Sequence, residues 1–404
     1  MDRSDWRQEI QALPVFDTHT HLNMPGVPIP ARDFWDIAHY FWFQQELWSV
    51  GYPIDPNALP ESERIERFVD ALHASRNTIW NGIVREMFHN LYEIDLVDAA
   101  SVREADTAVR ASFQNPDWSR QVVDRLAIRK IAVNNLADAD YPELPGIGVA
   151  VPSKGSFDRA LWSETILAAQ DRDQAVQAAL IDLQADVNRF YAMGICGMRV
   201  DLTPLQQPNM IALPDELPAV PDKATVDAWL THALFRALGR HGMFAQFFVG
   251  ISSVSNRSSM AVNDPTCIPT LYPLFERHAC GFEIVVGAPQ MNLDAAQAAR
   301  IYPNVHLGGL WWYNFRSSTY RQTMQVRLEA VPASKSSIVA SDARCIEWCY
   351  GKILLVKRLL AYFLFDQVKS GWLDRDTALW VAREWLHDAA ARRYLPQEQD
   401  AVTR

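Results

Sequence analysis

Two histidines near the start of the chain have a spacing that suits metal binding. His19 ends a β-type run that begins at Val15 and His21 follows two residues later, and side chains two residues apart on a strand point to the same face. Both imidazoles are therefore predicted to bind one divalent metal, with a third ligand from elsewhere in the chain. The alternative is two polar side chains on an exposed strand face, which the apolar residues on both sides disfavour.

A carboxylate near the other end of the chain is the candidate third ligand. Asp342 follows Ser341 directly after the apolar run Ile338–Ala340. If this run is the last strand of a closed barrel, it lies beside the first strand and brings Asp342 to the two histidines. Ser341 or Asp342 could instead cap the following helix, and Ser341 can do so while Asp342 binds metal. Two imidazoles and a carboxylate suit Zn2+ and would also accept manganese, iron or cobalt, so we expect one divalent ion, with Zn2+ as the first candidate.

The elements that would position these ligands alternate between short β-type runs and longer helical stretches. The runs predicted as strands are Val15–His19, Ala127–Asn134, Ile147–Val151, Ile195–Leu202, Met243–Gly250, Phe282–Val286, Val305–Trp311 and Ser337–Ala340. Eight such repeats predict a parallel sheet closed into a (β/α)8 barrel of the TIM type, an α/β fold whose active site lies at the carboxyl ends of the strands. An open doubly wound sheet is the alternative, but no Gly-x-Gly-x-x-Gly pattern follows the first run.

A long helical segment separates the first two predicted strands. Apolar residues recur there at helical spacing within Asp33–Val50, Glu61–His73 and Thr78–Asn90. We interpret residues 30–125 as a helical insertion that caps the barrel, and Cys345–Tyr394 as a helical C-terminal extension with Asp374 as an N-cap. Because no linker rich in Pro, Gly or Ser bounds the insertion, residues 1–404 are predicted to form a single barrel domain.

Composition and charge exclude several classes of function. The chain has 404 residues, 49% of them hydrophobic, and its 38 basic and 48 acidic side chains give a net charge of −10. This acidic balance argues against a nucleic-acid partner, which needs concentrated Lys and Arg. No run is apolar enough to span a membrane, and the start of the chain has no apolar signal segment, so a cytoplasmic enzyme is expected. The five cysteines lack zinc-ribbon spacing and are interpreted as reduced thiols.

Together these motifs resemble a known family. His-x-His after the first strand and a lone Asp after the last resemble the amidohydrolase superfamily. The chain resembles the uronate isomerases more closely, over most of its length and through three stretches: Asp17–Leu22, His39-Tyr40, and Gly309–Asn314 through to Ser341–Arg344. The resemblance implies a metal-dependent aldose–ketose isomerase that converts a hexuronate such as glucuronate or galacturonate into a ketouronate. It also implies a homo-oligomer.

Site residues follow from the same resemblance. It implies a catalytic Asp342 that also binds the metal, and an Arg344 that meets the substrate carboxylate or an enediolate. Arg344 could instead pair with an acidic side chain. The resemblance further places His39 as a proton carrier and Tyr40 as a hydroxyl donor near the substrate. Trp311 and Trp312 would line the substrate pocket, one as its wall and one packed behind it.

The sequence also departs from its relatives. Two-metal amidohydrolases use a Lys on strand four and His on strands five and six, which the corresponding runs here lack, so one metal is expected. Uronate isomerases usually carry a substrate-binding Arg on an early strand, and residues 148–154 contain none. Lys154, Arg159 or Arg199 could replace it, although the ammonium of a lysine is a point charge and cannot form the two parallel hydrogen bonds of a guanidinium. A related acid sugar, or a different reaction at the same metal, is therefore to be considered. His306, at the start of the seventh predicted strand, is interpreted as structural.

Two other functions are compatible with these residues. A mononuclear amidohydrolase-type hydrolase, such as a sugar lactonase, would use a metal-activated water with Asp342 as proton acceptor. A non-catalytic barrel that binds sugar acids would keep the pocket without turnover. The isomerase is preferred because the stretch from the paired tryptophans to Arg344 is more specific than His-x-His alone.

Overall fold

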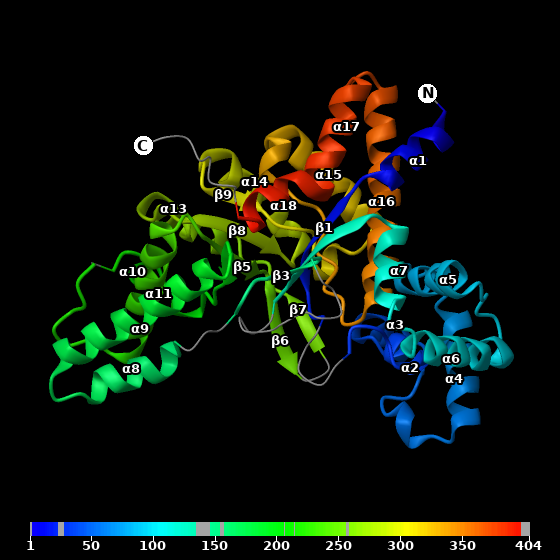
Figure 1. Cartoon of the computed structure of the whole chain (residues 1–404), viewed down its shortest axis with the longest axis horizontal. Helices are drawn as coiled ribbons and strands as arrows, with labels where there is room; N and C mark the ends of the chain where they lie inside the picture. Colours follow the sequence, from blue (N-terminus) through cyan, green and yellow to red (C-terminus); the bar gives the residue numbers. More distant parts are fainter. Residues whose placement is uncertain are drawn as a thin grey trace.

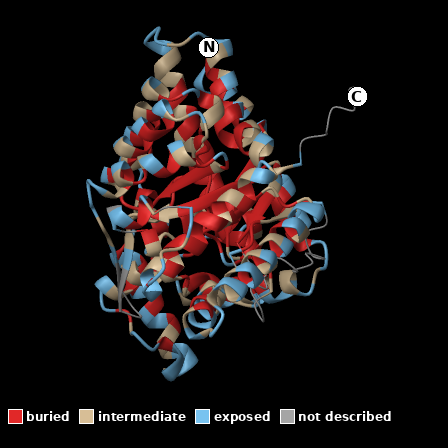
Figure 2. Ribbon diagram, turned by 90° about the vertical axis from the view of Figure 1, so that its left-hand side faces the viewer, coloured by how far each residue is buried: buried red, intermediate tan, exposed pale blue. Residues whose placement is uncertain are grey.

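Parallel strands form a barrel at the centre of the computed structural model, which describes residues 2–22, 28–134, 146–153, 157–205, 207–213, 215–255 and 258–396 (Figure 1). The strands are β1 (Val15–Thr20), β2 (Ile128–Val133), β3 (Gly148–Ala150), β4 (Gly197–Arg199), β5 (Phe244–Val249), β8 (Gly281–Val286) and β9 (Val305–Leu307). Their side chains are mostly buried (Figure 2). The run 336–343 supplies the eighth position through isolated bridges only.

Hydrogen bonds show how the barrel closes. Within the described residues the neighbours run β1-β2-β3 and β4-β5-β8-β9. The backbone N–H of Arg199 donates to Pro152 O at 2.9 Å and joins β4 to the β3 side. The run 336–343 bridges β9 at Leu307 and Ser336 and bridges β1 at Thr20 and Ala343. The predicted TIM-type barrel is confirmed, with a last strand too irregular to form a continuous ladder.

Helices surround the barrel between successive strands. They are α8 (Arg159–Ala168), α9 (Arg172–Ala192), α10 (Pro208–Ile211), α11 (Lys223–Arg240), α12 (Cys267–Thr270), α13 (Tyr272–Arg277), α14 (Asn292–Ile301) and α15 (Ser317–Ala330). Aspartates begin several of them: the side chains of Asp158, Asp171 and Asp222 accept backbone N–H groups of the first turns of α8, α9 and α11. A short antiparallel hairpin, β6 (Ile251–Ser255) and β7 (Ser258–Ala261), follows β5 and was not predicted.

The helical insertion after β1 is confirmed. It contains α2 (Phe34–Ala38), α3 (Phe41–Ser49), α4 (Glu61–Ala74), α5 (Ile79–Tyr92), α6 (Ala99–Phe113) and α7 (Trp118–Arg125), which lie together on one side in Figure 1. The Phe34 ring packs on Phe68 at 5.1 Å and on Phe88 at 5.3 Å, which ties α2 to α4 and α5. The single helix predicted over Asp33–Val50 is wrong, because the backbone turns at His39 and Tyr40 between α2 and α3.

The C-terminal extension is confirmed as helical. α16 (Ile346–Lys369) packs against α1 (Arg3–Ala12), α5 and α7. α17 (Arg375–Arg383) begins at Asp374, whose side chain accepts Thr377 N–H as predicted. A π-helical turn (Glu384–Asp388) leads into α18 (Ala389–Tyr394). Tyr394 packs on Phe16, the second residue of β1, and on Phe244, the first residue of β5, so α18 covers the amino end of the barrel.

One hydrophobic core links the insertion, β1, β2, the last strand and α16. A second core lies between β4, β5, β8 and β9 and their helices. That residues 1–404 form one domain with 30–125 as its cap stays a prediction. In the described part of the chain, no helix is long and apolar enough to cross a membrane.

Candidate metal centre

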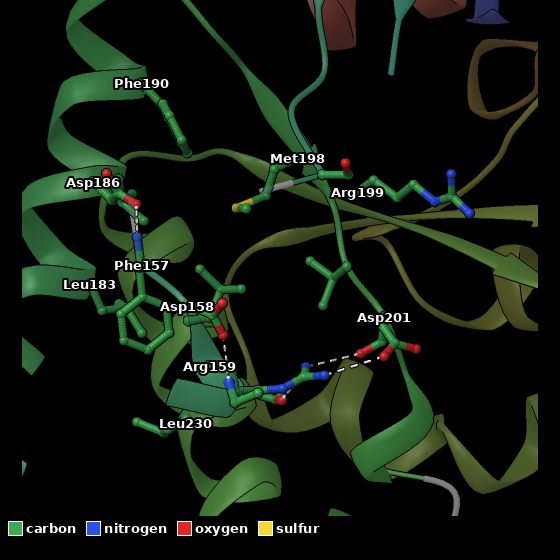
Figure 3. Close-up of a pocket in the computed structure, with 16 residues that line it drawn as sticks. Phe157, Asp158, Arg159, Leu183, Asp186, Phe190, Met198, Arg199, Asp201 and Leu230 are labelled. Carbon is green, nitrogen blue, oxygen red and sulfur yellow. Dashed lines mark hydrogen bonds and ion pairs between the residues drawn. The ribbon is translucent and has the colours of Figure 1, made fainter. Parts of the chain in front are cut away.

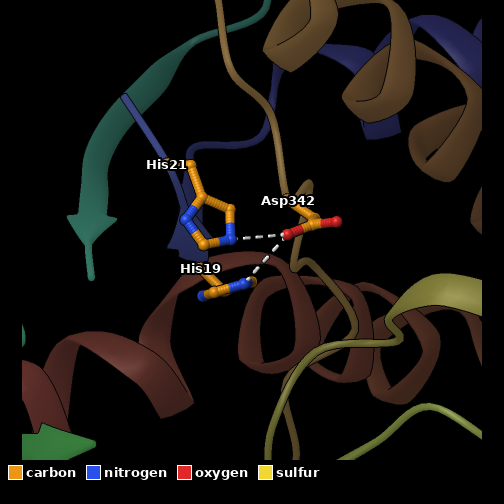
Figure 4. Close-up of side chains that lie close together, drawn as sticks. All are labelled: His19, His21 and Asp342. Carbon is orange, nitrogen blue, oxygen red and sulfur yellow. Dashed lines mark hydrogen bonds and ion pairs between the residues drawn. The ribbon is translucent and has the colours of Figure 1, made fainter. Parts of the chain in front are cut away.

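Three side chains from opposite ends of the chain meet at the carboxyl end of the barrel (Figure 4). The Nε2 atoms of His19 and His21 each lie 3.1 Å from Oδ1 of Asp342. One ligand atom from each residue lies within 4.8 Å of the others, and no second such group occurs in the described residues. His19 is fully buried, whereas 26% of the His21 side chain is exposed. The trio therefore has a closed side within the barrel and an open side at its mouth.

The local backbone explains why these side chains converge. His19 is the penultimate residue of β1 and His21 directly follows its last residue, Thr20, and the two imidazoles lie 4.9 Å apart between centroids. Asp342 has a left-handed backbone conformation, with φ at 53°, that L-residues adopt with strain. Its N–H donates to His19 O at 2.9 Å, and His21 N–H donates to Ala343 O at 2.8 Å. Backbone pairing thus holds Asp342 between the two histidines.

This donor set fits a divalent metal. Ligand atoms about 2 Å from a tetrahedral ion lie roughly 3.3 Å apart, close to the separations at Asp342. Burial lowers the pKa of His19 to about 4, which keeps the imidazole neutral as a metal ligand must be. Burial raises the pKa of Asp342, but the close contacts with His19 and His21 outweigh it and hold that pKa well below its usual range. Three protein ligands would leave coordination positions for substrate or water.

A side chain not predicted from the sequence orients His19. The Nδ1 atom of His19 forms a short hydrogen bond with Oδ1 of Asn134, the residue that follows β2. Since the Asn134 amide oxygen only accepts, Nδ1 must carry the proton and Nε2 is left free to bind metal. Asn134 Nδ2 donates in turn to Gln246 Oε1 at 2.9 Å.

Gln246 continues this contact through the barrel interior. Its Nε2 lies 2.8 Å from the Tyr394 hydroxyl and 3.1 Å from Oε1 of Glu283. Tyr394 donates to the same Glu283 carboxylate, which accepts from Arg393 Nε at 2.6 Å on its other oxygen. Buried hydrogen bonds therefore run from the metal ligand His19 to α18 at the far end of the barrel. Two polar residues inside apolar strands, Gln246 and Glu283, were the sequence signal for this network.

Aromatic rings form one wall of the centre. Phe248 on β5 lies 4.5 Å from the His19 ring and 4.7 Å from Trp311, measured between centroids. Trp311 is buried and contacts His19 edge-on, whereas Trp312 packs on Trp42 of the insertion. The sequence left open which tryptophan faces the centre, and Trp311 is the one beside it.

Arg199 lies on the same side of the barrel mouth. Its guanidinium stacks over Phe248 at 4.4 Å, and Figure 3 shows the side chain extending away from Phe157 and Arg159. Burial lowers its pKa, and the nearby charge of Asp342 acts in the opposite direction. No carboxylate of the described residues forms an ion pair with Arg199. It is therefore a cation next to the metal trio whose charge no ion pair neutralises.

The other candidates for the missing early-strand arginine lie elsewhere. Arg159 lines one pocket together with Arg199, but its guanidinium forms an ion pair with Asp201 at 3.2 Å and donates to Thr231 (Figure 3). Lys154 lies outside the described residues. Of the three, Arg199 alone is placed beside the trio by the structure.

Tyr40 contacts the backbone of the candidate ligand. Its hydroxyl donates to Asp342 O at 3.1 Å and accepts from Lys352 Nζ at 2.5 Å. Lys352 also donates to Ser341 O, and its ammonium lies among the rings of Tyr40, Trp80 and Phe315. The hydroxyl expected to donate to substrate is thus engaged with the turn that carries Asp342. Lys352, on α16, was not predicted as a site residue.

His39 and Arg344 line a pocket of about 530 Å³ between the insertion and the turn after Asp342, which we call the cap pocket. The His39 Nε2 atom lies 2.9 Å from the Tyr52 hydroxyl, and its ring stacks on Trp35. Burial and the charge of Arg64 lower the pKa of His39 to about 4. Arg344 is exposed to this pocket and forms no ion pair within the described residues.

His306 lies on β9 beside Glu283, away from the trio, where the sequence placed it. His232 and His278 contact each other at 2.9 Å among the outer helices. All five cysteines are free thiols.

Solved structures share this architecture across nearly the whole chain. A uronate isomerase from Thermotoga maritima superposes with a TM-score of 0.77 at 13% identity, covering 97% of each chain. The chain has the fold of the uronate isomerases. One from Bacillus halodurans gives 0.73 at 16% identity, covering 96% of this chain and 95% of that one. A glucuronate isomerase from Caulobacter crescentus gives 0.74 at 14% identity, covering 98% and 95%.

A further neighbour, from Lactobacillus casei, carries a provisional name as a metal-dependent hydrolase and gives a TM-score of 0.61 at 14% identity, with 96% of each chain covered. Neither a protein-family model nor a curated protein sequence matches this chain. The resemblance drawn from short motifs is therefore confirmed at the level of the fold.

Proposed function

We propose that this protein is a metal-dependent aldose–ketose isomerase of a hexuronate or a closely related acid sugar. The observation that carries the proposal is the His19–His21–Asp342 trio with Arg199 beside it. A metal-binding trio next to a cation without an ion pair suits a substrate that carries both hydroxyl or carbonyl oxygens and a carboxylate.

Each residue at the barrel mouth has a separate proposed role. A divalent cation held by His19, His21 and Asp342 would act as a Lewis acid toward the substrate oxygens. Arg199 binds the substrate carboxylate in place of the early-strand arginine of the relatives, and Arg344 faces the oxygens on the cap side. Isomerisation moves a proton from C2 to C1 of the open-chain sugar. His39, neutral near pH 7, is the proposed proton acceptor.

Phe248 and Trp311 keep the reacting end of the sugar away from bulk water. A dry wall strengthens the attraction between Arg199 and an anion, because charges interact more strongly at low dielectric. It also offers flat apolar surface to the C–H face of a sugar chain. Tyr40 acts indirectly, by holding the Asp342 backbone.

Zinc is the proposed metal, because two imidazoles and one carboxylate match its preferences. A cytoplasmic location and self-association into a homo-oligomer complete the proposal, the second from the family resemblance.

Incubation of the metal-loaded protein with glucuronate or galacturonate tests this proposal, with the products followed by NMR. A ketouronate should form from at least one common hexuronate, and Arg199→Met should slow its formation by about 100-fold. Failure to form a ketouronate from any of the common hexuronates would reject the proposal.

A hydrolase is the second candidate, because three ligands leave room for a water and one structural neighbour is named as a metal-dependent hydrolase. Incubation with a panel of sugar lactones in H2(18)O separates the two. Incorporation of solvent 18O into a product acid would support the hydrolase, whereas isomerisation consumes no water.

A further inference from the structure

The cap pocket concentrates positive charge in a protein whose net charge is negative. Four arginines line it, and two aspartates face them: the set is Arg32, Arg64, Arg110, Arg344, Asp33 and Asp36. Four positive charges against two negative charges leave an excess of two. Since the whole chain carries −10, this excess is a local feature of the pocket.

Two of the four arginines are neutralised. Arg32 makes two hydrogen bonds to the Asp36 carboxylate, at 2.8 and 2.9 Å. Arg110 pairs with Asp106 at 2.8 Å and reaches Asp33 at 3.4 Å. These pairs use both aspartates of the pocket together with Asp106, which lowers the local excess to one and leaves Arg64 and Arg344 as the two lining arginines without a carboxylate partner among the described residues.

Arg64 is held in place without a carboxylate. Its guanidinium stacks on Trp35 at 4.2 Å, and its Nη1 donates to Asn57 Oδ1 at 3.0 Å. Its buried Nε has no hydrogen-bond partner, and no acidic side chain among the described residues pairs with it. Because Trp35 and Asn57 fix the group while its charge stays unmatched, Arg64 is built to receive an anion that the chain does not supply.

The remaining cation, Arg344, lines the pocket from another part of the chain. It is two residues from Asp342, whereas Arg64 comes from α4 in the insertion. An acid sugar bound at the metal trio needs Arg199 for its carboxylate and Arg344 for its reacting oxygens, as proposed above. Arg64 is then one cation more than a monoanionic sugar acid can use.

We infer that the cap pocket is a distal substrate subsite in which Arg64 binds a second anionic group, so that the preferred substrate is a doubly anionic acid sugar that keeps its reacting carbonyl and bears the second anion on a further carbon or substituent. The second group is a carboxylate or a phosphate, both of which match the planar fork of a guanidinium. Arg64 acts as a specificity-determining residue. This inference rests on the proposed function for the position of the first carboxylate only.

Three ligands with the same six-carbon skeleton test it: gluconate, glucarate and 6-phosphogluconate. They differ only at C6, which carries a hydroxyl, a carboxylate or a phosphate, and none has the carbonyl that isomerisation requires. Calorimetric titration of the metal-loaded protein therefore measures binding without turnover. The binding result can be interpreted even if the protein shows no isomerase activity.

At least one of the two dianions should bind about tenfold or more tightly than gluconate, as expected for a hydrogen bond to a charged group. The dianion preferred identifies the second group as carboxylate or phosphate. Arg64→Met should remove this preference while gluconate binding stays within about twofold, because the variant keeps the apolar contact with Trp35.

Arg67→Met is the matched control. Arg67 is on the same helix, is exposed and pairs only with Glu63 at 3.6 Å, so this variant changes the net charge equally and should keep the preference. Equal binding of all three compounds, no binding of any, or equal loss in both variants would overturn the inference. Thermal unfolding of each variant confirms that the fold is intact.

Discussion

The proton-bearing Nδ1 of His19 faces the side-chain oxygen of Asn134, which leaves the other ring nitrogen of His19 directed at Asp342. The contact joins the end of β1 to the end of β2, and so the barrel itself sets the tautomer of a metal ligand. Partners of this kind commonly contribute as much to metal affinity as some ligands do.

Replacing Asn134 should therefore weaken metal binding without touching a ligand. Asn134→Leu is expected to lower zinc affinity by about 10- to 100-fold, because His19 loses its orientation and tautomer. Asn134→Asp retains an accepting oxygen and should recover most of the affinity. Competition with a chromogenic chelator measures both, and equal affinity in Asn134→Leu and the native protein would refute this role.

Arg199 should determine substrate binding and turnover but not metal content. Arg199→Met is expected to lower kcat/KM by about 100-fold, since the substrate carboxylate would lose a charge-assisted partner in a partly dry site. Arg199→Lys should recover only part of the lost kcat/KM, because a point charge cannot bind a carboxylate with two parallel hydrogen bonds. Steady-state kinetics on the active hexuronate, with metal analysis of each variant, give the readout. Loss of metal in Arg199→Met would show a structural role instead.

Two buried lysines on α16 offer a matched pair of variants. Lys352 holds Tyr40 and Ser341 O beside the metal trio, whereas Lys357 donates to the carbonyls of Gln11, Leu13 and Leu126 near α1. Each Lys→Met variant removes the donor of at least one buried carbonyl oxygen and should cost about 1–3 kcal/mol of unfolding free energy.

Only Lys352→Met should also weaken metal binding, because it alone releases the turn that carries Asp342. Urea unfolding of the metal-free proteins and metal titration of the folded ones separate the two effects. If both variants bound metal equally well, the Lys352–Tyr40 contact would have no part in shaping the centre.

Acidification should destabilise the protein through buried neutral histidines. Burial lowers the pKa of His232 to about 4 and that of His278 to about 3, with Arg277 and Arg236 lowering both further and Asp215 opposing them. Unfolded histidine titrates near 6.5, so between about pH 6.5 and 4 the unfolded chain binds more protons and stability falls as the pH drops.

The expected slope is roughly 1.4 kcal/mol per pH unit for each histidine. Urea unfolding of metal-free protein at pH 7, 6 and 5 measures it. His278→Gln keeps a donor for His232 Nδ1 but removes one titrating group, so its slope should be smaller by about that amount. An unchanged slope in this variant would contradict the assignment.

Local pattern was enough to predict the barrel and the trio. Apolar runs such as Phe244–Val249 mark buried strands, and His-x-His on the first and Asp342 after the last are brought together by closure of the sheet. The turn at His39 and Tyr40 was not predicted, because the apolar spacing continues across it and no local residue ends the helix.

The hydrogen-bond network inside the barrel was not predicted, for a different reason. Asn134, Gln246, Glu283 and Tyr394 lie far apart in the sequence, and each is an ordinary polar residue on its own element. Only the register of β5 against β8, which pairs Gln246 with Glu283, reveals that they face one another. Lys352 was not predicted either, because it lies in a mostly apolar helix and its partners are a backbone carbonyl, a hydroxyl and aromatic faces, which no local sequence pattern indicates.

Metal content is the most direct test of the central claim that His19, His21 and Asp342 bind one metal ion. Elemental analysis of gently purified protein should find one divalent ion per chain, and that ion should be lost in both His21→Ala and Asp342→Ala, with the helical circular dichroism retained. An ion that persists in those variants, a second ion of equal occupancy, or a native protein that takes up none on titration would contradict the account.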